Sequence, residues 1–312
     1  ARTLPITASA PRAVVLGKIA GIEKVPDGAV SLRMNGKGAV RHSSENITID
    51  AKTDKPGINI FVKPGTKGET VYIPVIVTES GVQDMVYNDF DIGEGADVTI
   101  IAGCGIHNDG CSESRHDGIH RFRLHKGAKL KYVEKHVGEG SGEGTRVLNP
   151  TTEVDMDEET ACEMELVQLG GGDSTYRKST AVLAAGAKLT MTERLMTHGS
   201  QVAHSDMSAE MNGEDAAVQI ISRSVARDAS VQVFHPVAIG NAPCRAHVQC
   251  DAIIMDKAKV SSIPEISANH AEAQIVHEAA IGRINNDQLL KLQTFGLNET
   301  EAEEVIIDGF LK

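Results

Sequence analysis

The chain has no tryptophan, and only four tyrosines and six phenylalanines among its 312 residues. Hydrophobic residues still make up 41% of the sequence, which is enough for a folded core. That core must therefore consist of Val, Ile, Leu and Ala, which favour thin, regular layers of strands. Few aromatic rings also argue against a sugar-binding groove, in which rings stack on the substrate.

Clusters of basic residues are also missing, and the formal net charge is −12. Contacts to phosphate require Lys and Arg, so we expect neither nucleic acid nor a membrane surface as a partner. No apolar run reaches the length of a membrane span, and the first residues lack the apolar segment of a signal peptide. The five cysteines are odd in number and widely spread, which predicts free thiols in a reducing, cytoplasmic environment.

Short β segments separated by Gly, Asp and Asn fill residues 37–280. The phrase "small or acidic residue, Ala, any residue, Val or Leu" recurs as GADVTI, GAKLKY, GAKLTM, DAAVQI and DASVQV. Stacked short strands with small residues at the corners predict a mainly β fold, a β-solenoid, with a β-sandwich as the alternative. The clearest strands are 71–77, 97–103, 129–137, 163–170, 188–196, 217–226 and 230–240.

The two ends of the chain differ from this core. Residues 1–36 carry short mixed segments that support no assignment, whereas residues 281–312 are helical in pattern. One helix over 286–296 ends at Gly296, and a second begins at Asn298 with Glu301 as its capping-box partner. We expect this pair to cover the last coil, whose strand edges would otherwise be exposed, and to form a docking surface.

Residues 102–122 are the first candidate for metal chemistry. They place Cys104, His107, Cys111, His116 and His120 close together in the sequence. Thiolate and imidazole are ligands that Zn²⁺, Fe²⁺ and iron–sulfur clusters prefer. The spacing matches no standard zinc-finger or ferredoxin pattern, and a polar loop with incidental thiols is the alternative interpretation.

Cys250, His277 and Glu278 are the second candidate for metal chemistry. A single cysteine in a strand, such as Cys162 or Cys250, is more often part of the core than a metal ligand. A His–Glu pair ahead of a helix is more often a hydrogen-bonded surface pair. Taken alone, these residues do not decide between a metal site and a structural role.

The Gly-rich segments 138–145 and 169–174 lack the Gly-Lys-Ser/Thr of a phosphate loop, so we interpret them as flexible turns. The sequence also contains no Ser-based catalytic motif.

The C-terminal third resembles the SufB/SufD family of iron–sulfur cluster assembly proteins. Over residues 250–310 the words Cys-Asp, Pro-Glu-Ile, His-Glu-Ala, Gln-Leu, Phe-Gly-Leu and Gly-Phe occur in the order of that family. The upstream segment YNDFDIGEGADVTI resembles the family core as well. The chain is similar to the compact archaeal and anaerobe form, in which one polypeptide serves where SufB and SufD pair.

The resemblance implies a right-handed parallel β-helix with a small helical C-terminal domain. It implies a homodimer formed through the β-helix ends and a SufC-like ABC-type ATPase bound to the C-terminal helices. Cys250 resembles the acceptor and ligand cysteine, His277 the histidine kept at the turn, and Glu278 the carboxylate after it. The cargo would be a transient iron–sulfur cluster, expected to be 4Fe-4S, with a sulfur donor and recipient apoproteins as further partners.

Three functions remain open from the sequence. The first is a scaffold, not an enzyme, with its site at Cys250, His277 and Glu278 and a second locus around Cys104. The second is a β-solenoid metal-dependent hydrolase that uses the loop from Cys104 to His120. The third is a SufD-like structural partner that holds the ATPase and binds no cluster.

Overall fold

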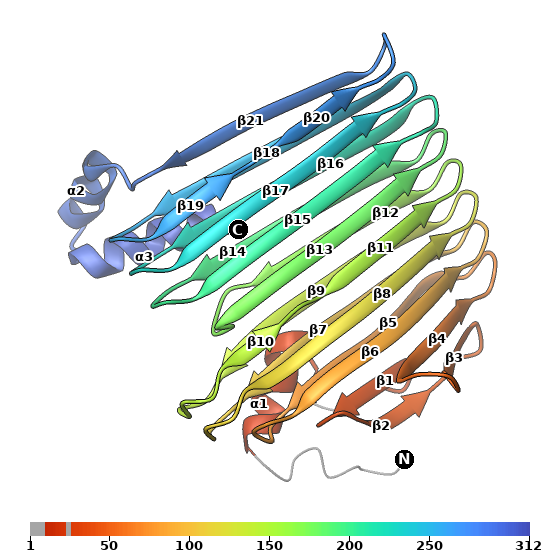
Figure 1. Cartoon of the computed structure of the whole chain (residues 1–312), viewed down its shortest axis with the longest axis horizontal. Helices are drawn as coiled ribbons and strands as arrows, with labels where there is room; N and C mark the ends of the chain where they lie inside the picture. Colours follow the sequence, from red (N-terminus) through yellow and green to blue (C-terminus); the bar gives the residue numbers. More distant parts are fainter. Residues whose placement is uncertain (1–9, 23–25) are drawn as a thin grey trace.

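The computed structural model describes residues 10–22 and 26–312. Its strands wind into a β-solenoid of about 8 turns, with one sheet on each side (Figure 1). The predicted mainly β solenoid is therefore confirmed, and the β-sandwich alternative is wrong.

Within the described residues each sheet continues through the whole solenoid. Sheet A holds β1 (Ala29–Met34), β2 (Lys37–His42), β5 (Lys67–Val77), β7 (Asp97–His107), β9 (Lys129–Glu139), β12 (Ala161–Gln168), β14 (Lys188–Thr197), β16 (Ala216–Ala226), β18 (Cys244–Ile254) and β21 (Gln274–Gly282). Sheet B holds β3 (Ile47–Ala51), β4 (Gly57–Val62), β6 (Gln83–Ile92), β8 (Ser114–Leu124), β10 (Arg146–Leu148), β11 (Thr151–Met156), β13 (Ser174–Leu183), β15 (Val202–Met211), β17 (Val231–Gly240), β19 (Lys259–Ser262) and β20 (Glu265–Ala268).

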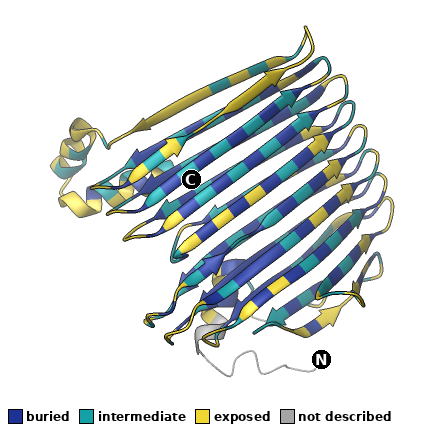
Figure 2. Cartoon of the chain, viewed as in Figure 1, coloured by how far each residue is buried: buried dark blue, intermediate teal, exposed yellow. Residues whose placement is uncertain are grey.

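Parallel pairing places equivalent residues of successive coils in columns. Val98 pairs with Leu130, and Leu130 pairs with Cys162 one coil further on. Side chains alternate between the two faces of a strand, so every second residue points between the sheets. Figure 2 shows the resulting alternation of buried and partly exposed residues along the strands. Cys162 is a buried member of the apolar core.

Helix α1 (Ala10–Ala20) packs on the outer face of sheet A. Val15 and Ile19 are fully buried there. Gly103 and Gly105 on β7 make this approach possible, because a Cβ at either position would overlap Ile19 or Val15. The two glycines that flank Cys104 are thus explained by helix packing.

The first coil ends in two antiparallel pairs. Strand β2 folds back on β1 at the margin of sheet A, and β3 folds back on β4 at the margin of sheet B. Strand β1 also pairs in parallel with β5, which joins this end to the solenoid. Strands β2 and β3 each pair with one neighbouring strand among the described residues, so the strand edges at this end belong to antiparallel pairs.

Helices α2 (Asn286–Thr294) and α3 (Glu299–Phe310) lie close to their predicted positions. Gly296 has φ +96°, and the Asn298–Glu301 capping box is formed as predicted. The expectation that the pair covers the last coil is wrong. Ile307 and Leu311 pack on apolar side chains near the ends of β16 and β18, so the helices sit beside the solenoid (Figure 1).

The last coil consequently remains uncovered. All of β20 is exposed, and β21 is exposed except for two half-buried residues, Ile275 and His277. Strands β19, β20 and β21 each pair with only one neighbouring strand among the described residues. The C-terminal end of the solenoid therefore presents two open strand edges.

Candidate functional site

Buried polar side chains form a row between the two sheets, within an otherwise apolar core. All of them occupy inward-facing strand positions, and each is less than a tenth exposed. Buried charges are tolerated only when they are paired, so their partners decide what the row can do. This polar row consists of Asp84, His116, His120, Glu134, His136, Arg177, Glu193, Ser205 and Ser222.

The row begins at Asp84 on β6. Its carboxylate accepts hydrogen bonds from Arg33 Nε at 2.9 Å and Arg33 Nη2 at 2.6 Å, and lies 3.1 Å from His116 Nδ1. Burial raises the pKa of Asp84, but the hydrogen bonds from His116 and Arg33 outweigh burial and hold that pKa well below its usual value. Asp84 is thus a carboxylate with its hydrogen bonds satisfied.

Glu134 on β9 forms the centre of the row. It accepts hydrogen bonds from Arg177 Nη1 at 2.7 Å and Tyr132 Oη at 2.6 Å. Burial raises the pKa of Glu134, but the charge of Arg177 and the other groups around the carboxylate together outweigh burial and lower that pKa to about 2. Burial also lowers the pKa of His120 to about 4 and that of His136 to about 3. At neutral pH both imidazoles are therefore uncharged and Arg177 is the counter-ion of Glu134.

Cys104 on β7 borders a small polar cavity. The cavity has a volume of about 20 Å³ and is also lined by His116, His120, Glu134 and His136. A volume of this size suffices for one water molecule. Burial, assisted by nearby carboxylates, raises the pKa of the Cys104 thiol well above its usual value. Cys104 is therefore a protonated, unreactive thiol at neutral pH.

Residues 102–122 prove to be two strands and a corner instead of one loop, because β8 was not recognised in the sequence. Cys104, His116 and His120 face the interior from β7 and β8. Cys111 is exposed at the corner, and His107 Nε2 lies 2.8 Å from Asp109 at the surface. No three His, Cys, Asp or Glu side chains in the described part of the chain are arranged to hold a metal ion.

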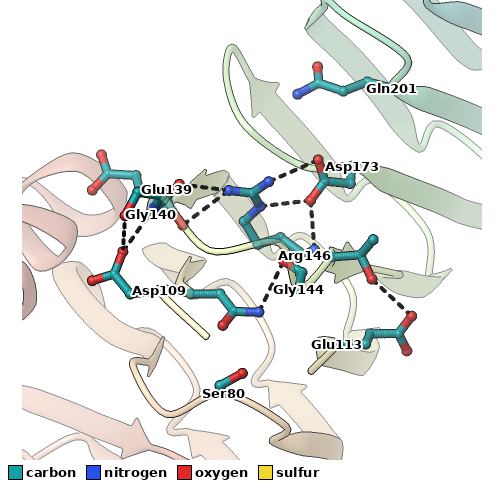
Figure 3. Close-up of polar contacts among 12 residues, drawn as sticks. Ser80, Asp109, Glu113, Glu139, Gly140, Gly144, Arg146, Asp173 and Gln201 are labelled. Atoms are coloured by element: carbon teal, nitrogen blue, oxygen red, sulfur yellow. Dashed lines mark hydrogen bonds and ion pairs between the residues drawn. The ribbon is translucent and has the colours of Figure 1, made fainter. Parts of the chain in front are cut away.

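The Gly-rich segments that follow are closely packed corners, not flexible turns (Figure 3). Arg146 forms an ion pair with Asp173 at 2.7 Å and donates to the Gly140 carbonyl at 3.0 Å. A Cβ at Gly140 would overlap the backbone of Asn108, and one at Gly144 would overlap that of Ser112. These glycines allow successive corners to stack, which explains their number without a bound phosphate.

The polar row ends at Ser222 on β16, whose register partner on β18 is Cys250. Arg177 Nε lies 3.6 Å from Glu193, and the Ser222 hydroxyl donates to Glu193 at 2.9 Å. Ser222 and Cys250 are register partners on neighbouring strands, and both face the interior. Burial raises the pKa of the Cys250 thiol, while the Ser262 hydroxyl acts in the opposite direction. Cys250 thus lies on β18, between the polar row and the edge strand β21 at the open end of the solenoid.

His277 faces inward, as Cys250 does, from the neighbouring strand of sheet A. It is within β21, not at a strand–helix turn, and it pairs in register with Val248, two residues before Cys250. Its Nε2 atom is buried and has no hydrogen-bond partner among the described residues. A thiol and an unsatisfied imidazole nitrogen at an open solenoid end are suitable ligands for iron.

Glu278 faces the other side of sheet A. It is the register partner of Gln249, and its carboxylate lies 2.8 Å from His247 Nε2 on the outer surface. Successive strand residues point to opposite faces, so Glu278 and Cys250 of one chain cannot share a ligand on the inward face. The structure thus places Cys250 and His277 on the inward face of two neighbouring strands and Glu278 on the outer face.

Sequence reasoning missed Glu134, Arg177 and Glu193. A signal was present, since alternation in 129–137 places Tyr132, Glu134 and His136 on the same face as Leu130. Recognising that this face is the buried one requires the pairing of several strands, which a single segment does not reveal.

The two C-terminal helices present apolar side chains to the outside. Leu290 is 59% exposed, Phe295 75% and Val305 50%. Helix α2 has no buried residue at all.

Among the described helices, none combines the length and apolar character needed to cross a bilayer.

Comparison with known proteins agrees with this architecture. Residues 77–310 match the family described as SUF system FeS cluster assembly, SufBD core domain. An iron–sulfur cluster assembly SufBD family protein of Methanocaldococcus jannaschii is 28% identical over 86% of this chain and 85% of its own length. A relative of the same description from Archaeoglobus fulgidus is 26% identical over 88% and 73%. The chain therefore belongs to the SufBD family and has a role in iron–sulfur cluster assembly.

Proposed function

We propose that this chain is a scaffold that holds a nascent iron–sulfur cluster as cargo at a homodimer interface and does not turn over a small-molecule substrate of its own. The observation that carries this proposal is that Cys250 and His277 share the inward face of neighbouring strands, β18 and β21, at the uncovered end of the solenoid. A thiolate binds iron and sulfide firmly, whereas imidazole exchanges more readily, so the pair suits a site that must release its product.

The open strand edges support self-association. The apolar residues Val276 (57% exposed) and Ile281 (39%) on β21 and Ile266 (43%) on β20 lie at this end. Pairing of the last coils of two chains would cover these edges and bring two copies of Cys250 and His277 near the symmetry axis. Glu278 would then stand at the outer rim of the same interface.

The exposed apolar side chains of α2 and α3 support a docking site for a SufC-like ABC-type ATPase. Nucleotide hydrolysis would occur on that partner, since neither Gly-rich segment forms a phosphate loop. Helix α3 packs on the ends of β16 and β18, close to the last coil, so movement of the helices would bias opening of the dimer. A sulfur donor would load the site and apoproteins would receive the cluster.

A metal-dependent hydrolase is not proposed. The predicted ligands His107 and Cys111 lie outside the interior, and the cavity beside Cys104 has a volume of only about 20 Å³. This space has room for a water molecule and excludes an organic substrate.

The test is anaerobic reconstitution with Fe²⁺ and sulfide, with visible absorbance and the iron and sulfide content per dimer as readouts. The wild-type chain should hold a chromophore that Cys250→Ser loses while fold and dimer remain. Cys111→Ser is the matched control, because Cys111 is exposed and distant in the fold from the last coil.

Three other outcomes would contradict the assignment. A chromophore that survives Cys250→Ser would move the site elsewhere. Loss in Cys111→Ser as well would indicate adventitious thiol chemistry. No chromophore in any variant would favour the cluster-free, ATPase-holding partner.

A further inference from the structure

His235 on β17 lies between two carboxylates on the outer face of sheet B. Its Nδ1 atom is 3.2 Å from Asp206 on β15, and its Nε2 atom is 2.9 Å from Glu265 on β20. It links the uncovered edge strand to the body of the solenoid.

This geometry requires the charged imidazolium. A carboxylate only accepts hydrogen bonds, whereas a neutral imidazole has a single N–H to donate. Both contacts can therefore form only when both ring nitrogens are protonated. In agreement, the hydrogen bond to Glu265, assisted by Asp206, raises the pKa of His235 above its usual value.

The two contacts are not equally secure. The Asp206 carboxylate also lies 2.9 Å from His204 Nε2 and accepts a hydrogen bond from the Tyr176 hydroxyl. The ring of Tyr176 packs at an angle against the ring of His204. Among the described residues, Glu265 forms a side-chain hydrogen bond only with His235, and its strand is fully exposed. A neutral His235 can donate to only one of the two carboxylates, so one contact is lost and the remaining one no longer has the assistance of the imidazolium charge.

We propose that His235 is a pH-dependent latch, which holds edge strand β20 on the solenoid when protonated and releases it when neutral. The charged and titratable groups around it are Asp206, Glu265, His204 and Tyr176. If the open end is the dimer interface, as proposed above, the latch makes that interface weaker at alkaline pH.

The direction of the pH effect follows from the difference between the pKa values of His235 in the folded and unfolded chain. A base with a raised folded-state pKa adds stability that is complete below its unfolded pKa and is lost as the pH rises through the folded pKa. For His235 the loss begins above about 6.5, the usual value for histidine, and continues through its raised pKa. The pair is partly exposed, so the effect on strand opening is modest.

Hydrogen exchange detected by mass spectrometry tests the latch on the metal-free chain at about pH 6 and pH 8.5, corrected for intrinsic exchange. In the wild type, amides of β20 should open roughly two- to fivefold more often at the higher pH. In Glu265→Gln this difference should vanish, because a carboxamide can donate to a neutral imidazole nitrogen as well as accept from it. His235→Gln should also remove the difference.

His247 supplies the matched control on the other sheet. Its one side-chain hydrogen bond among the described residues is with Glu278 at 2.8 Å, and a neutral tautomer satisfies one carboxylate, so His247→Gln should leave the pH response of β20 intact. Equal protection of β20 at both pH values, or a pH response that persists in His235→Gln, would overturn the latch. Light scattering on the same samples reports the oligomeric state, so a wholly monomeric chain would refute the dimer without affecting the latch.

Discussion

Arg177 and Glu134 form an ion pair across the solenoid interior, with Nη1 and Oε1 2.7 Å apart and both side chains 3% exposed. Removing one partner leaves the other charge buried without compensation. We expect Arg177→Met to lower the free energy of unfolding by about 3–5 kcal/mol in denaturant titrations. Arg121→Met is the control, because the Arg121–Glu153 pair is about half exposed and should contribute at most about 1 kcal/mol. Equal losses in both variants would contradict the role of burial.

Acid should destabilise the chain from about pH 6.5 downward. His120 and His136 have pKa values of about 4 and about 3, below the usual 6.5, so the unfolded chain binds more protons in this range. The stability contributed by these groups is complete above pH 6.5 and is lost as the pH falls toward 4 and 3. Glu134, with a pKa of about 2, adds a loss below 4.5. Urea titrations between about pH 7.5 and 4 measure the slope, and His136→Gln should flatten it.

His277 and Glu278 are neighbours in sequence but lie on opposite faces of β21, so substitutions at the two positions should have different effects on iron retention. His277→Ala removes the inward-facing ligand proposed above and should lower iron retention after reconstitution by about 10–100-fold. Glu278→Gln leaves the inward face unchanged and should retain iron much better. Iron content after gel filtration under anaerobic conditions is the measurement. A larger loss in Glu278→Gln than in His277→Ala would show that the outer rim binds the cargo.

A charge on the open edge should prevent self-association. Val276 on β21 is 57% exposed, and lysine on an edge strand opposes pairing with a second chain. Val276→Lys should therefore shift the chain to monomer in analytical ultracentrifugation. Val202→Lys serves for comparison, since Val202 is 46% exposed on β15, away from either open edge. A dimer that resists the first change and dissociates with the second would locate the interface on the face of sheet B.

Local patterns predicted much of the fold. The recurring small-residue corners and alternating strands indicated the solenoid, and Asn298 with Glu301 indicated the start of α3, because these features depend on residues close together in the chain. The position of a helix or strand in space depends instead on contacts with residues far away in the sequence. The place of α3 follows from Val225 and Ile253, two apolar residues at outward-facing strand positions that it covers.

The candidate site was predictable in composition and less so in geometry. The words around Cys250 and His277 indicated the residues, but only the register shows that these two share a face and that Glu278 does not. The interior charges were missed for a similar reason. Glu134 and Glu193 lie far apart in sequence, and their common counter-ion, Arg177, comes from the opposite sheet.

The two ends of the solenoid also determine how far association can proceed. A solenoid with matching edges at both ends could add further chains head to tail without limit and grow into a fibre. Here the two ends differ: the edge strands β2 and β3 run antiparallel to their neighbours, whereas β19, β20 and β21 run parallel to theirs. If the last coils of two chains pair, as proposed above, the antiparallel edges of the first coils stay at the outer ends of the dimer, and further growth would need a different kind of contact.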